Sequence, residues 1–176
     1  MAFYDELVAA TEDARNDLLS IPFIRMGSAG QLSLESYSAF LGQAYHHVKH
    51  TTPLLMATGG RLPERLEWLR EAIGEYIEEE MGHQEWILND IEACGFDKEA
   101  VRKDQPLAAT ELMVAYAYDT VHRNNPVGFF GMVLVLEGTS VSLATHAASN
   151  IQQSLNLPKT AFSYLNSHGS LDVGHV

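Results

Sequence analysis

Apolar side chains recur every three or four positions along nearly the whole chain, a spacing that places them on one face of an α-helix. No stretch keeps the apolar–polar alternation of a half-buried strand. Proline, glycine and capping residues divide the pattern into separate segments. The predicted helical segments cover about residues 3–19, 33–58, 62–94, 98–103, 107–122, 125–152 and 158–176.

Signals at the ends of these segments support the division. Ser33 is a capping residue for the second segment, and Asn125 followed by Pro126 is typical of a helix start. Gly95 suits the left-handed position that follows the third segment, and we expect Gly74 to bend it. A loop is predicted between the first and second segments.

Short connections between helical segments favour an all-α bundle with antiparallel neighbours. The chain shows no linker, low-complexity tract or internal repeat, so we expect a single domain over residues 1–176. The last predicted helix continues to Val176 without a capping residue. We therefore expect that the bundle lacks, or does not show, its last helices.

Composition and charge exclude several classes of protein. Lys and Arg number 11 against 23 Asp and Glu, a net charge of −12, which argues against binding to nucleic acid or to anionic membrane surfaces. Cys94 is the only cysteine, so disulfides and cysteine-based metal sites are excluded. The sequence shows neither a signal peptide nor an apolar stretch of about 18 residues, and it predicts a cytoplasmic protein without membrane contact.

Three possible metal ligands occur together near the C-terminus. His168, Asp172 and His175 are spaced four and three residues apart, so on a helix they lie within about 60° of one another. Chance produces such a triplet rarely in a chain of this composition. The alternative interpretation is a solvated polar face on a terminal helix.

A second pair lies in the third segment. Glu80 and His83 have the Glu-x-x-His spacing by which one helix offers a carboxylate and an imidazole to the same metal in di-iron bundles. Glu79 competes for the carboxylate role, because it lies four residues before His83. The alternative is a solvated acidic face with an incidental histidine.

Glu137 is the only acidic residue between Asp119 and Asp172, and it lies in the middle of the most apolar predicted helix. We expect it to be buried, and a buried carboxylate is costly unless it is paired or bound to a metal. No Lys or Arg occurs from 126 to 157. An Arg from another helix and protonation of the carboxyl group are the alternatives to a metal.

A histidine cluster, Tyr45-His-His-Val-Lys-His50, lies in the second segment. His46 and His50 share a helix face and could bind a metal, but three histidines without a nearby carboxylate are more typical of residues packed around a site. Four side chains are candidates for contacts to the ligands or to a substrate: His47, His50, Tyr76 and Glu79.

Together these signals supply three carboxylates and three imidazoles from three helices. Oxygen-rich ligation with imidazoles and no thiolate favours iron or manganese. Six ligands divide naturally over two ions about 3.5–4 Å apart.

The order Glu80-x-x-His83, Leu136-Glu137-Gly138 and His168-x3-Asp172-x2-His175 resembles the haem-oxygenase-like diiron oxidases, whose fold is shared with thiaminase-II-like and quinone-synthase-like proteins. The pattern is closest to that of the terminal-alkene-forming fatty-acid decarboxylases. The resemblance implies a haem-oxygenase-like bundle and a homodimer. It also implies that Glu80, His83 and His168 hold one Fe(II), that Glu137, Asp172 and His175 hold the other, and that no haem is bound.

The resemblance implies an Fe(II)- and O2-dependent oxidoreductase acting on a small molecule. The apolar segment around Phe129 and Leu134 suggests a partly hydrophobic substrate that carries a carboxylate or an amine. Two alternative functions belong to other classes of protein. One is a metal-free thiaminase-II-like or quinone-synthase-like enzyme, which would need Cys94 as nucleophile or basic residues around an acidic substrate. The other is a metal-binding bundle without turnover.

Overall fold

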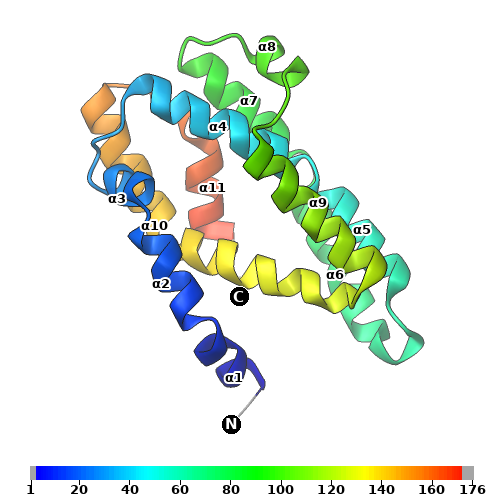
Figure 1. Cartoon of the computed structure of the whole chain (residues 1–176). Coiled ribbons are helices and arrows are strands. Elements are labelled where there is room, and N and C mark those ends of the chain that lie inside the picture. Colours follow the sequence, from blue (N-terminus) through cyan, green and yellow to red (C-terminus); the bar gives the residue numbers. More distant parts are fainter. Residues whose placement is uncertain (1–2, 172–176) are drawn as a thin grey trace.

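The computed structural model describes residues 3–171, without the side chains of 140–142 and 168–171. Within this part of the chain every regular element is helical, as the sequence predicts (Figure 1). The α-helices are α1 (Phe3–Ala10), α2 (Glu12–Ser20), α3 (Pro22–Ser28), α4 (Leu34–Val48), α5 (Thr51–Arg61), α6 (Glu67–Glu80), α7 (His83–Ala93), α8 (Lys98–Lys103), α9 (Ala108–Arg123), α10 (Phe129–Leu155) and α11 (Ser163–Leu171). Single 3-10 turns cover Glu64–Leu66, Pro126–Gly128 and Lys159–Ala161.

Three predicted segments are divided in the structure. The first is interrupted at Thr11, which lies between α1 and α2 and whose hydroxyl also donates to the Leu7 carbonyl at 2.9 Å. The second breaks after Val48 because Pro53 cannot donate to the carbonyl of Lys49 four residues earlier, and its ring would clash with that group. The predicted loop before Ser33 is wrong in part, since α3 occupies it with a proline at its first position.

The third segment breaks at Met81–Gly82 and not at Gly74, through which α6 continues. Gly82 has a φ of 97°, a left-handed conformation that costs little for glycine alone. No heavy atom would contact a Cβ added at Gly82, so backbone conformation and not space requires glycine here. The prediction that Glu80 and His83 share one helix is therefore wrong: Glu80 ends α6 and His83 begins α7.

Two hydrophobic cores lie along the chain. The first joins α4, α7 and the second half of α10, and includes Tyr37, Ile87 and Phe162. The second joins α5, α6, α9 and the first half of α10. Helix α10 contributes to both. Its first half, taken with the preceding 3-10 turn as Pro126–Thr139, meets its second half, Leu143–Leu155, at 47°. Figure 1 shows it crossing the lower part of the molecule before it turns up towards α3.

Within the described residues, no individual helix has both the length and the apolar character needed to cross a bilayer; only the two halves of α10, taken together as a bent pair, meet that test.

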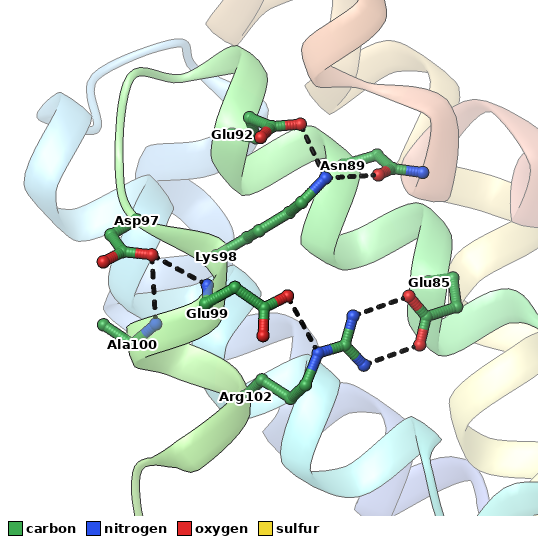
Figure 2. Close-up of polar contacts among 8 residues, drawn as sticks. All are labelled: Glu85, Asn89, Glu92, Asp97, Lys98, Glu99, Ala100 and Arg102. Carbon is green, nitrogen blue, oxygen red and sulfur yellow. Dashed lines mark hydrogen bonds and ion pairs between the residues drawn. The ribbon is translucent and has the colours of Figure 1, made fainter.

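Helix α8 is fixed on the outside of α7, near the point where His83 begins that helix. Arg102 of α8 donates two hydrogen bonds of 2.8 Å to the Glu85 carboxylate, and Lys98 contacts Glu92 at 2.7 Å (Figure 2). The arginine lowers the pKa of Glu85. Such exposed pairs each stabilise a fold by only about 0–1 kcal/mol, so their main effect is to fix the position of α8.

Candidate functional site

Glu80 and His83 form the most buried ionisable pair that the structure describes. Their residues are 4% and 1% exposed, and Glu80 Oε2 lies 3.1 Å from His83 Nδ1. The left-handed turn at Gly82 separates the two helices and leaves the side chains on either side of it in contact. The second carboxylate oxygen, Oε1, is also buried and has no hydrogen-bond partner in the described part of the chain. A buried carboxylate oxygen without a donor is costly, and such a group is typical of a cation site.

The surroundings of this pair distinguish Glu80 from its neighbours. Glu79, the rival for the ligand role, has an exposed side chain. Tyr76 is buried one helical turn before Glu80, as expected for a side chain close to the pair. Trp86 covers the His83 imidazole, with the two ring centroids 4.0 Å apart. Trp86 therefore shields the pair on its His83 side, whereas the Glu79 side chain is exposed.

Glu137 lies in α10 just before the bend. It is half-buried, so the expectation of full burial is wrong. Its position belongs nevertheless to the buried stripe of α10, because Val133, Ala144 and Ala148 follow the same helical register and are all buried. Helix α10 thus presents one acidic residue on an otherwise apolar face.

The C-terminal triplet is only partly described. His168 belongs to α11, but its side chain lies outside the described part, and Asp172 and His175 fall outside it altogether. Among the side chains that are described, no three of the types His, Cys, Asp and Glu gather closely enough to hold a metal ion. Of the six predicted ligands, the structure brings together Glu80 and His83.

Asp90 is a functional candidate that sequence reasoning missed. It is fully buried on α7, where Oδ1 accepts from the Ser163 amide at 3.0 Å and from the Ser163 hydroxyl, and Oδ2 accepts from the Tyr164 amide at 2.9 Å. Burial raises the pKa of Asp90, although these hydrogen bonds act in the opposite direction. Asp90 therefore joins the start of α11, the helix of His168, to α7, the helix of His83. The sequence signal that could have identified Asp90 is an acidic residue close to the apolar residues Ile87, Leu88 and Ile91.

Two histidines at the end of α4, His46 and His47, and His50, just before α5, face two different sites. His47 lines an apolar cavity, described below, whereas His46 and His50 line a polar cleft with Lys49 and residues of α9. His46 Nδ1 lies 3.3 Å from Lys49 Nζ, and His50 Nδ1 lies 3.1 Å from the Tyr118 hydroxyl. These contacts fix His46 and His50 at the polar cleft.

This cleft makes stability depend on pH. Burial lowers the pKa of His46 and of His50, and Lys49 acts in the same direction, while Glu111 opposes the shift. The unfolded chain takes up these protons below about pH 6.5, so the unfolding free energy should decrease as the pH falls through 6.5 and the lower folded-state pKa values. Urea unfolding at a series of pH values should show a smaller decrease for His46→Gln, whereas His122→Gln, at an exposed position, should behave as wild type.

An apolar cavity of about 380 Å³ lies between α4, α10 and the helices around them. Leu136 and Thr139, on either side of Glu137 in the sequence, line it, and so does Tyr164, four residues before His168. The cavity size lies within the range of small-molecule sites. Separate helices form it, so sequence periodicity gave no sign of it.

Comparison with known proteins decides the family. Residues 38–176 match the model of a family described as iron-containing redox enzymes. The chain belongs to this family. A search of curated protein sequences finds no match.

Two solved structures share the fold of this member of the iron-containing redox enzyme family. A domain of unknown function with a heme oxygenase-like fold from Shewanella denitrificans is 26% identical, with a TM-score of 0.85 over 99% of this chain and 75% of that one. A TenA homolog from Pseudomonas syringae pv. tomato is 14% identical, with a TM-score of 0.76 over 95% of this chain and 73% of that one. The chain therefore has the haem-oxygenase-like fold that the sequence predicts, and the second likeness shows the fold alone.

Proposed function

We propose that this family member is a non-haem diiron oxidase or oxygenase that uses Fe(II) and O2 to oxidise a small, partly hydrophobic substrate bearing a carboxylate or an amine. The observation that carries the proposal is the buried Glu80–His83 pair, whose free carboxylate oxygen fits a cation. Membership of a family of iron-containing redox enzymes supports iron as that cation.

The spacing of the pair also fits a cation. Adjacent ligand atoms of an octahedral ion at about 2.1 Å are separated by about 3.0 Å. Glu80 Oε2 and His83 Nδ1 lie 3.1 Å apart, so both atoms can approach one ion with little movement. A carboxylate and an imidazole without a thiolate suit iron or manganese.

In this proposal Glu80, His83 and His168 hold one Fe(II), and Glu137, Asp172 and His175 hold the other. When bound, the iron supplies the electrons that reduce O2. The chain itself supports this chemistry in two ways. Trp86 and Tyr76 exclude water from the Glu80–His83 pair, and the apolar cavity beside α10 holds the substrate near Glu137.

The thiaminase-II-like alternative requires a nucleophilic cysteine. Cys94 is buried, and burial together with the nearby Asp90 raises the pKa of its thiol to about 11, so little thiolate forms at neutral pH. This observation favours the oxidase over that alternative.

Anaerobic titration with Fe(II) tests the proposal. The oxidase should bind two Fe(II) per chain and develop a transient visible absorption band when O2 is admitted. One bound Fe(II) without reaction with O2 would instead indicate a metal-binding bundle without turnover. Absence of iron binding, together with tight binding of a pyrimidine, would indicate the thiaminase-II-like enzyme.

A further inference from the structure

The apolar cavity differs in chemistry between its two ends. At the end beside α3, the rings of Phe23 and Phe40 pack with centroids 5.5 Å apart, and Tyr37 lies 6.5 Å from Phe40. Gly27 of α3 also lines this end, next to Ile151 of α10. Aromatic and aliphatic groups therefore enclose the α3 end.

The opposite end, beside α9, carries polar side chains. Gln43 Oε1 accepts hydrogen bonds from the Leu107 amide at 2.9 Å and from the Thr110 hydroxyl at 2.7 Å, which fixes α4 against α9. His47 follows one turn later and also lines the cavity. His47 lies seven positions after Phe40 on α4, a rise of about 10 Å. The cavity is thus polar beside α9 and apolar beside α3.

Glu137 is adjacent in the sequence to residues that line the cavity from the first half of α10. Leu136 and Thr139 line the cavity from the first half of α10, whereas Ile151 lines it from the far end of that helix, against α3. A ligand that fills the cavity therefore has one end near Glu137 and its other end among the rings of Phe23 and Phe40.

We infer that the cavity binds an amphipathic molecule in one direction, with an unbranched apolar tail in the α3 end, and that Phe40 limits the length of this tail. Burial of each methylene favours binding, and the ring of Phe40, packed against Phe23, blocks further entry of the tail. The inference rests on the proposed function in one respect, namely that the polar end of the ligand faces the iron site. The tail pocket is inferred from the residues that line the cavity and does not depend on iron.

Calorimetric binding of a series of n-alkanols, from butanol to decanol, to the metal-free protein tests this inference. Affinity for the wild type should rise about three- to fourfold with each methylene up to a limiting length and then fall. In Phe40→Ala the limit should move to a longer alkanol. No binding of any alkanol to the wild type, or an unchanged limit in a natively folded Phe40→Ala protein, would overturn the inference.

A second variant changes the pocket in the opposite direction without endangering the fold. A Cβ at Gly27 would lie 3.5 Å from Leu32 Cδ1 and 4.0 Å from Ile151 Cδ1, which are ordinary contacts, and alanine favours the helix. Gly27→Ala should move the limit to a shorter alkanol, and Leu112→Ala, on the exposed side of α9, should leave it unchanged. An unchanged limit in Gly27→Ala would also count against the tail pocket. These outcomes are independent of iron, so failure here and failure of the Fe(II) titration remain distinguishable.

Discussion

Glu80→Gln should lower the affinity of one iron site by more than about 100-fold, and anaerobic titration should then find one tightly bound Fe(II) per chain where the wild type binds two. The amide keeps the shape of the side chain but removes the negative charge that a cation needs. Without metal, the unfolding free energy should be unchanged or higher, because the substitution removes a buried charge whose Oε1 has no donor in the described part of the chain.

The adjacent residue provides the matched control. Glu79→Gln makes the same chemical change one position earlier, on an exposed side chain. It should retain both iron ions. Full iron binding by Glu80→Gln, or loss of an iron in Glu79→Gln, would contradict the assignment. Glu137→Ala should likewise lose one iron with little change in the stability of the metal-free protein, whereas a loss of several kcal/mol (~3–5) would identify Glu137 as a structural ion-pair member.

Asp90→Ala should reduce the unfolding free energy by about 2–4 kcal/mol in urea unfolding. The change removes the acceptor of three hydrogen bonds and leaves the amides of Ser163 and Tyr164 without it at the start of α11. Because α11 carries His168, this variant should also weaken iron binding, and amide hydrogen exchange in α11 should become faster than in α4.

The exposed cap of α8 is the control for this effect. Asp97 also accepts two amide hydrogen bonds, from Glu99 at 2.9 Å and Ala100 at 3.2 Å (Figure 2). Asp97→Ala removes a cap of similar geometry where water can replace it, so it should cost about 1 kcal/mol and leave iron binding intact. Equal losses for the two variants would mean that Asp90 is no more than an ordinary helix cap.

Much of the fold follows from local sequence signals. The period of apolar residues predicts the helices, and Ser33, Gly95 and Asn125 mark boundaries that the structure confirms, with Gly95 at a φ of 88°. The breaks were harder to predict. The helical spacing of apolar residues continues across Gly82, so it predicts one helix there. Glycine adopts positive and negative φ about equally readily, and the sequence alone does not show that φ is positive at Gly82.

The sequence predicts site residues only where their spacing along the chain determines how close their side chains lie. Glu80 and His83 come together even though the helix predicted to join them is broken, because the Gly82 turn restores their proximity. Asp90 and the apolar cavity depend on how distant helices pack, and neither has a local pattern. The half-buried state of Glu137 has the same origin, because the bend of α10 and its neighbours decide exposure there.

The central claim is that two iron ions bind between the helices carrying Glu80, Glu137 and His168. Anomalous diffraction at the iron edge from anaerobically Fe(II)-loaded crystals measures this directly. The account predicts two peaks about 3.5–4 Å apart, one beside Glu80 and His83 and the other beside Glu137. Iron found only at the surface, or fully loaded crystals without a peak at the Glu80–His83 pair, would contradict it.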